Sequence, residues 1–228
     1  MIRCWRALSV AFCAALLLPS SPAQVTTKAG KGTFRIKWVK GKSYNYSVNV
    51  SALIPGSSKV MNNPFSLKLR VLDVKGSVAN VEYRLAGAQG VAEGPKTAKV
   101  DSLGKSASGS GLSDILVSYP AKPLAVGESY TVSQPATATM FGKAATTLKL
   151  KYKGLGTGGG RKVANFDVET TLKGASTAGA GKGTMTVDVA DGMVLTMKQS
   201  LSVQARSTDS KGKTQTTTVP VQLTVQLK

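Results

Sequence analysis

Apolar and polar residues alternate along most of the chain after residue 33, and this two-residue period restricts the fold more than any other feature. The run from Phe65 to Val71, for example, has apolar side chains at every second position, with Ser66, Lys68 and Arg70 between them. Successive side chains of a β-strand point to opposite faces, so the run predicts a strand with one face in the core and one in water. Burial on one face is typical of antiparallel sheets.

The pattern predicts at least about ten strands. It occurs in residues 34–38, 44–50, 65–71, 81–85, 148–152, 166–168, 185–189, 195–197, 201–205 and 219–227. Turn-forming dipeptides separate the runs, and the clearest hairpin extends from Thr184 to Ala205 with its turn at Asp191-Gly192. We therefore expect an all-β fold of antiparallel sheets, arranged as two related β-units or as one distorted barrel. Beyond the first segment we expect almost no helix, with one short stretch near residues 113–117.

Residues 1–23 have the three parts of a secretory signal peptide. Arg3 and Arg6 precede an apolar stretch from Ala7 to Leu18, and the small residues Ser21 and Ala23 suit positions −3 and −1 of a cleavage site. The apolar stretch is too short to span a bilayer, and we find no other of transmembrane length. We therefore expect an exported protein, periplasmic or extracellular, whose residues 24–228 form one β-rich region.

The residue types that are missing restrict the chemistry. The chain contains no histidine, and both of its cysteines, Cys4 and Cys13, lie in the predicted signal peptide. The exported region would therefore lack disulfides, thiol nucleophiles and the commonest general base and metal ligand. We expect a protein that is not an enzyme and has no cofactor or metal; a hydrolase that uses Ser and Lys or paired carboxylates is a third, weaker alternative.

Two parts of the chain resemble each other, which suggests an internal duplication. Gly41-Lys42-Ser43-Tyr44 matches Gly127-Glu128-Ser129-Tyr130, and Val78-Ala79-Asn80-Val81-Glu82 matches Val163-Ala164-Asn165-Phe166-Asp167. Leu67-Lys68-Leu69 matches Leu148-Lys149-Leu150, and Val100-Asp101 with Gly104 matches Val187-Asp188 with Gly192. The matches keep the same order, at offsets of 81 to 88 residues. A period this long predicts two copies of one β-unit, within residues 33–110 and 120–228, rather than a solenoid.

Two short motifs could be mistaken for functional sites. The string Gly179-Ala180-Gly181-Lys182-Gly183-Thr184 is similar to the phosphate-binding loop of adenylate kinases, but a strand pattern follows it where that loop needs a helix. We therefore expect it to form a flexible hairpin loop. Asp188 and Asp191 could share a calcium ion in a turn. A turn that uses Asp-Gly geometry is the better interpretation, because Asp-x-x-Asp-Gly is a common pattern.

Positive charge is the most informative functional feature. The net charge is +19, and it becomes +17 without the two arginines of residues 1–23. If the strands that carry them are neighbours, seven basic residues on polar strand faces form one surface that binds anionic envelope polymers or an anionic membrane surface. These candidate anion-binding residues are Arg35, Lys37, Lys68, Arg70, Lys149, Lys151 and Lys153. The alternative is that lysines simply keep the exposed sheet soluble.

Two other partners are considered. Nucleic acid is disfavoured, because aromatic residues are 6% of the chain and Trp38, Tyr44 and Tyr46 fall on inward positions, where bases cannot stack on them. A carrier of a lipid or another apolar ligand is the second hypothesis, since a curved sheet with an apolar lining can enclose a ligand cavity. Phe34, Ile36, Trp38 and Met193 would belong to that lining; an ordinary filled core is the alternative.

Three stretches resemble exported bacterial β-sheet proteins that contain domains of unknown function. They are Gly41 to Tyr44, Pro120 to Glu128, and Gly183 to Asp188 before Gly192. The architecture that the resemblance implies is distantly similar to the half-barrels of envelope lipoprotein carriers. The resemblance implies an exported location and a β fold, and it supplies no catalytic residues.

Overall fold

The computed structural model describes residues 24–53, 59–87, 94–106, 112, 116–139, 142–208 and 214–228. The predicted signal peptide lies outside these residues, as does part of the helical stretch expected near 113–117. The strands are β1 (Val25–Lys28), β2 (Lys31–Phe34), β3 (Ser43–Leu53), β4 (Val60–Lys75), β5 (Val78–Gly87), β6 (Lys96–Asp101), β7 (Leu124–Ala125), β8 (Ser129–Thr139), β9 (Gly142–Gly158), β10 (Arg161–Gly174), β11 (Thr177–Asp188), β12 (Val194–Thr208) and β13 (Thr214–Leu227).

Over the described ranges, the strands form two antiparallel sheets, which confirms the predicted all-β class. The small sheet has the order β1-β2-β7, and the ten-stranded sheet has the order β6-β5-β4-β3-β13-β12-β11-β10-β9-β8. The large sheet is not closed, because β6 and β8 are its two edges. Of the two predicted arrangements, the single barrel is therefore not what the chain forms.

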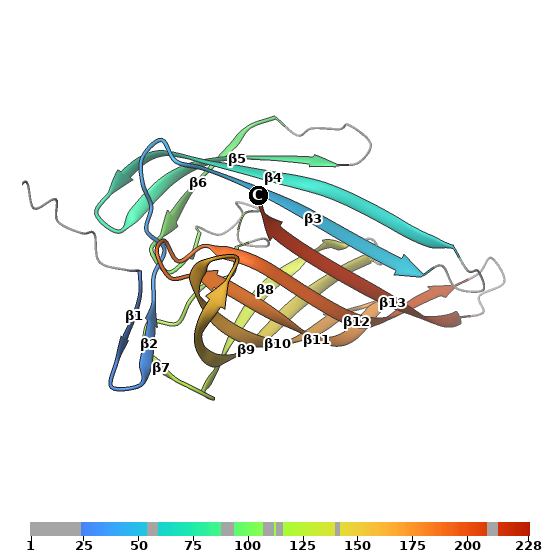
Figure 1. Cartoon of the computed structure of the whole chain (residues 1–228). Coiled ribbons are helices and arrows are strands. Elements are labelled where there is room, and N and C mark those ends of the chain that lie inside the picture. Colours follow the sequence, from blue (N-terminus) through green and yellow to red (C-terminus); the bar gives the residue numbers. More distant parts are fainter. Residues whose placement is uncertain are drawn as a thin grey trace, which may run out of the picture.

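The large sheet consists of two series of antiparallel strands, and β13, the final strand of the chain, joins them in the middle of the sheet. Strands β3–β6 and β8–β13 each follow one another in sequence, and β13 returns to pair with β3 through Val221–Leu227 and Tyr46–Ala52. Figure 1 shows the two series curving toward each other, with β3–β6 above and β8–β12 below. Their apolar faces pack on one core that includes Tyr46, Leu69, Leu150 and Phe166. Consequently, the polar faces of the two series point away from each other.

The predicted strand at residues 34–38 is only partly a strand. β2 ends at Phe34, and residues 35–39 continue as an extended segment that belongs to neither sheet. Its amide groups donate to three different segments: Arg35 to Gln24, Ile36 to Ser102 and Lys37 to Asp191. Burial still alternates along it as in a strand: Phe34, Ile36 and Trp38 are buried in the shared core, and the residues between them are partly exposed.

Strands β3 and β8 begin in the same way, at the positions where the sequence suggested a repeat. The amide of Gly41 donates to Val71 at 2.8 Å, and the amide of Gly127 donates to Tyr152 at 2.7 Å. A bulge follows at matching places in the two strands. Leu72 of β4 has no partner residue in the register with β5, and Lys153 of β9 has none in the register with β10. These shared contacts support the proposal that β3–β6 and β8–β11 derive from one unit.

The glycine-rich string at residues 179–184 lies within β11 and forms no loop. A Cβ atom at Gly181 or Gly183 would overlap a carbonyl oxygen of β12, that of Ser200 or Lys198 respectively. Across the same strand, the buried Thr170 hydroxyl of β10 donates to Gln199 of β12 at 2.7 Å. The glycines therefore let β10 and β12 approach each other over β11, and the string serves packing.

Candidate anion-binding face

The seven predicted anion-binding residues lie in three separate places. Lys68 and Arg70 are on β4, and Lys149, Lys151 and Lys153 are on β9. Five strands separate β4 from β9 in the large sheet, and the polar faces of the two hairpin series point away from each other. The condition that the strands be neighbours is not met, so the seven residues do not form one basic face.

Arg35 and Lys37 lie on the extended segment after β2. The guanidinium group of Arg35 donates to the carbonyl oxygens of Phe34, Pro120 and Ala121 at 2.6, 3.3 and 3.0 Å. Its donors therefore join β2 to the segment before β7. The amide of Lys37 donates to Asp191 at 2.8 Å, and its half-buried side chain lies beside Trp38. Both residues have a structural role in joining segments of the chain.

The lysines of β9 face carboxylates on β10. Lys149 pairs with Glu169 at 3.4 Å and Lys153 pairs with Asp167 at 3.3 Å, while Lys151 lies directly opposite Asp167. Each paired side chain is about half exposed, so each ion pair contributes little to stability. The pairs nevertheless place a negative charge beside each of these lysines.

The lysine and arginine of β4 lie in a different environment. Lys68 is directly opposite Arg84 of β5, and Arg70 is directly opposite Glu82. Within the described part of the chain, no ion pair joins Lys68, Arg70 or Arg84 to a carboxylate. Like charges directly opposite each other on neighbouring strands destabilise a sheet. The opposition of Lys68 and Arg84 therefore has a cost, and neither side chain forms an ion pair with a carboxylate of the described residues that would offset it.

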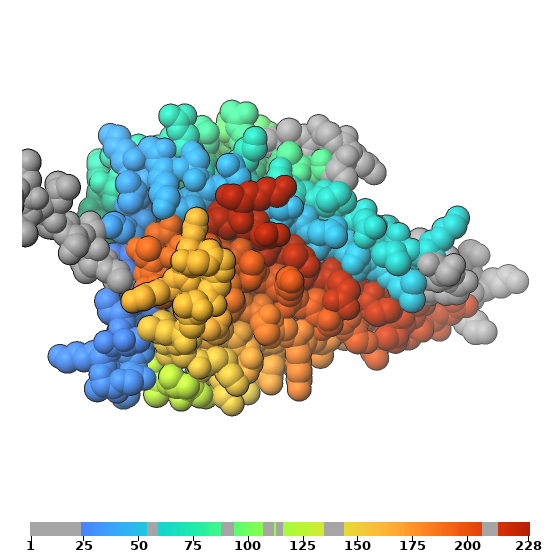
Figure 2. All heavy atoms as spheres, viewed as in Figure 1, coloured from blue at the N-terminus to red at the C-terminus, as the bar shows by residue number. Residues whose placement is uncertain are grey.

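These residues surround a shallow hollow of about 260 Å³ on the outer face of β3, β4 and β5. We call it the β3–β5 hollow. Figure 2 shows β13, β3 and β4 side by side in red, blue and turquoise. Three cationic side chains and one carboxylate reach the hollow, together with the hydroxyl and amide groups of β3. Its lining is Ser43, Asn45, Lys68, Leu69, Arg70, Glu82 and Arg84.

Of the polar residues that line this hollow, only Lys68 and Arg70 were predicted from the sequence to bind anions, and Ser43, Asn45, Glu82 and Arg84 were not. The signal for Arg84 was present, because it alternates with the buried residues Val81 and Tyr83 and therefore had to face outward. The turn at Lys75 and Gly76 joins β4 to β5, and the two strands pair with each other. The missing step was the register, which places Arg84 directly opposite Lys68.

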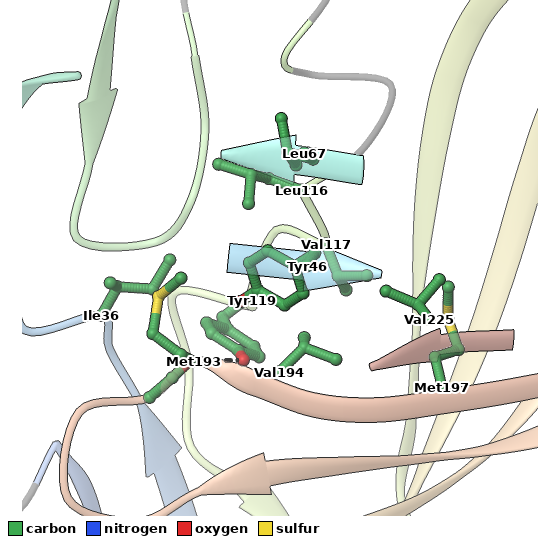
Figure 3. A pocket seen from close by; sticks show the side chains of 11 residues that line it. Ile36, Tyr46, Leu67, Leu116, Val117, Tyr119, Met193, Val194, Met197 and Val225 are labelled. Carbon is green, nitrogen blue, oxygen red and sulfur yellow. Dashed lines mark hydrogen bonds between the residues drawn. The ribbon is translucent and has the colours of Figure 1, made fainter. Parts of the chain in front are cut away.

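An apolar cavity lies between the two hairpin series, beneath residues 116–119 (Figure 3). Its volume is about 30 Å³, and its lining includes Ile36, Tyr46, Leu116 and Met193. The buried Tyr119 hydroxyl donates to the carbonyl oxygen of Gly192 at 2.7 Å beside it. Ligand pockets usually occupy about 300 Å³ or more. This cavity is therefore much smaller than a usual ligand pocket, and it gives the carrier hypothesis no support.

Asp188 and Asp191 are separate turn residues rather than a calcium pair. Asp188 Oδ1 accepts from the amide of Ala190 at 2.8 Å, and Asp191 Oδ1 accepts from the amide of Met193 at 3.0 Å. Their other oxygens bind different cations: Asp188 pairs with Arg161 at 3.2 Å, and Asp191 pairs with Lys42 at 2.8 Å. In the described residues, no cluster of three or more acidic side chains has the geometry of a metal site.

The Lys42–Asp191 pair lies beside the start of β3. Partial burial of the Lys42 ammonium is the largest single effect and opposes its charge, but the hydrogen bond to Asp191 and the charges of Asp191 and Tyr44 together outweigh it and raise the pKa of Lys42 above its usual value. The ammonium also lies 4.9 Å from the ring centroid of Tyr44. Burial raises the pKa of Tyr44, Tyr46, Tyr119 and Tyr130. The Lys42–Asp191 pair and the hydrogen bond from Tyr119 to Gly192 hold the loop between β11 and β12 in place.

Comparisons with known proteins show no family for this chain. No family model matches the sequence, and no curated protein matches it. Among solved structures, the chain is similar to a Bacteroides fragilis protein described as exported and as having a YmcC-like fold. The sequence identity is 12%, the alignment covers 86% of this chain and 99% of the other, and the TM-score is 0.39. Separately, no helix of the described residues is long and apolar enough to cross a membrane.

Proposed function

We propose that this protein is an exported, non-enzymatic binding protein that holds an anionic polymer on the outer face of β3–β5. The proposal rests on one observation: Lys68 and Arg84 lie directly opposite each other on β4 and β5, and both line the β3–β5 hollow together with Arg70. A bound anion would offset the repulsion between these cations. The predicted signal peptide and the strongly positive net charge are consistent with a partner in the cell envelope.

The exposed apolar residues favour a polymer over a membrane surface. Proteins that bind membranes peripherally combine basic residues with apolar side chains that enter the lipid. None of the large exposed apolar side chains of the described residues lines the hollow. They are Val39, Leu53, Val60, Met61, Val78, Val126 and Leu155.

The polymer is not expected to be a nucleic acid. The aromatic residues nearest to the hollow, Tyr44, Tyr46 and Tyr83, lie on the inner sides of β3 and β5 and are buried. Stacking of bases on exposed rings is a main source of affinity in single-strand binders. The hollow therefore has cationic and neutral donors but no aromatic surface.

Binding of long-chain polyphosphate to the protein without residues 1–23 tests the proposal. We expect binding at low ionic strength that weakens steeply as salt is added, because exposed charges are screened. Replacing Arg84 by Glu should weaken binding about tenfold or more, since a charged donor becomes a like charge of the ligand. Lys198→Glu is the matched control: it changes the net charge equally, and Lys198 lies opposite Thr184 and Thr224, outside the hollow.

The two variants separate specific from general attraction. Equal weakening by R84E and K198E, or no binding of polyphosphate by the native protein at low salt, would overturn the proposal. Vesicles of anionic phospholipid are the second probe. Stronger binding to vesicles than to polyphosphate would show that a membrane surface is the partner and that a polymer is not.

A further inference from the structure

The outer face of β3–β6 and the outer face of β8–β11, the first four strands of the second series, have the same arrangement of positions. In the first series, Ser43 lies opposite Arg70, which lies opposite Glu82. In the second, Ser129 lies opposite Lys151, which lies opposite Asp167. Both rows thus read hydroxyl, cation, carboxylate across three strands, and a threonine follows on the fourth strand of each, at Thr97 and Thr184.

The adjacent row differs in one charge. In the first series, Asn45 lies opposite Lys68, which lies opposite Arg84. In the second, Thr131 lies opposite Lys149, which lies opposite Glu169. Arg84 and Glu169 therefore occupy matching positions and carry opposite charges.

This difference changes what each face can bind. At the four matched positions, the first series has three cations and one carboxylate, whereas the second has two of each. Glu169 also lies between Lys149 and, on the other side, Lys182 of β11. The lysines of the second face are thus partly neutralised within the chain, and those of the first face are not.

We infer that the residue at this position, Arg84 in the first series and Glu169 in the second, decides which of the two matching faces binds an anion, and that the bound group is a dianionic phosphate such as the terminal group of a polyphosphate chain. The inference deepens the proposed function and rests on it. Neighbouring strands lie about 4.8 Å apart, and alternate residues of one strand lie about 7 Å apart. Lys68, Arg70 and Arg84 therefore converge on an area of about the size of one phosphate group.

Charge also fits this group. Three cations and Glu82 give the hollow a net charge of +2, and a phosphate monoester carries a charge between about −1.5 and −2 at neutral pH. Arginine donates to phosphate through two parallel N–H groups. The side chains of Ser43 and Asn45 add neutral donors at the β3 side of the hollow.

A charge swap tests the role of Arg84 without changing the net charge. The double variant R84E/E169R should bind polyphosphate with an affinity similar to that of the native protein, but at the second face. A further Lys149→Glu change should then weaken binding about tenfold, while Lys68→Glu should have little effect. In the native background, the sensitivity of the two lysines should be reversed.

The single variants keep the test decisive. E169R alone should add a second binding site, and Glu169→Gln should add a weaker one, because each removes the carboxylate that competes with the ligand. Both should fold normally, since the Lys149–Glu169 pair is about half exposed. No gain of binding in E169R and E169Q, with R84E weakened as expected, would overturn the inference while the proposed function stands. No binding by the native protein would instead overturn the proposed function.

The pH dependence of competition tests the phosphate. Inorganic phosphate should displace polyphosphate more effectively as the pH rises from about 5 to about 8, because its second ionisation has a pKa near 6 to 7. Inorganic sulfate should show no such change, and the chain has no histidine that would ionise in this range. An equal pH profile for the two anions would overturn the assignment to a dianionic phosphate.

Discussion

Lys42 and Asp191 are 149 residues apart in the sequence, and their charged groups lie 2.8 Å apart. The pair joins the turn before β3 to the loop between β11 and β12, which belong to different hairpin series. Asp191 has two further contacts, since its second carboxylate oxygen accepts from the buried amide of Met193 and its main-chain carbonyl accepts from Lys37. One short loop thus fixes the extended segment, the first series and the second series relative to one another.

Replacing Asp191 by Ala should lower the free energy of unfolding by about 2 kcal/mol, because the buried amide of Met193 loses its acceptor. Asp191→Asn keeps that acceptor and loses only the ion pair, whose Lys42 partner is 43% exposed, so it should cost less than about 1 kcal/mol. Urea unfolding followed by the fluorescence of Trp38 measures both values. Equal losses in the two variants would show that the turn contact contributes little.

The Lys42–Asp191 pair should also make stability depend on pH in the alkaline range. The pKa of Lys42 is raised in the folded protein, so the contribution of the pair is complete below the unfolded pKa of about 10.4 and is lost as the pH rises through the folded pKa. The difference in unfolding free energy between the native protein and Lys42→Met should therefore be constant from pH 7 to about 10 and should shrink above it. A difference that persists unchanged at higher pH would contradict this.

The buried tyrosines should ionise only when the protein unfolds. Burial raises the pKa of Tyr46, Tyr119 and Tyr130, so the neutral hydroxyls stabilise the fold below the unfolded pKa of about 10, and this stability is lost as the pH rises above it. A spectrophotometric titration of phenolate should show these groups appearing together with the loss of Trp38 fluorescence. Ionisation of all six tyrosines before any unfolding would contradict the prediction.

Gly192→Ala should destabilise the protein by about 3 kcal/mol or more. Gly192 has φ of 73°, and a Cβ atom there would overlap the carbonyl oxygen of Arg35, so strain and overlap add to each other. Gly127→Ala is the matched control: its φ is 88° but its Cβ would meet open space, so it should cost only about 1 kcal/mol. Thermal unfolding of both variants checks the difference, and similar costs would mean that the segment at Arg35 moves away freely.

The alternation of residues was enough to predict most individual strands and the side on which each side chain lies. The run around Leu67 and Leu69 forms β4 with Lys68 and Arg70 outside, and the hairpin at Asp191-Gly192 lies where its turn signal placed it. β6 and β8 were not predicted, and the segment 35–39 was predicted as a strand but is not one. Its pattern is that of a strand, but three different segments accept its hydrogen bonds, and a local pattern cannot distinguish such partners from a sheet.

The duplication remains a prediction, although the turns at Gly41 and Gly127 have the same hydrogen bonds. Its consequence for the candidate site is that Arg84 and Glu169 occupy matching positions, and only the strand register shows this. The sequence placed Arg84 and Glu169 outward, but it could not show that each faces a lysine across the ladder, since register depends on turn lengths and bulges.

The sequence by itself determined the β class, the inner and outer face of each strand and the excess of positive charge, because these follow from the local two-residue period and from composition. Tertiary structure alone decided that β13 pairs with β3. It also decided that the large sheet curves until the apolar faces of its two hairpin series share one core. That curvature directs Lys68 and Lys149 to opposite sides of the molecule. Long-range strand pairing depends on the packing of the whole apolar surface, and no short segment of the sequence encodes it.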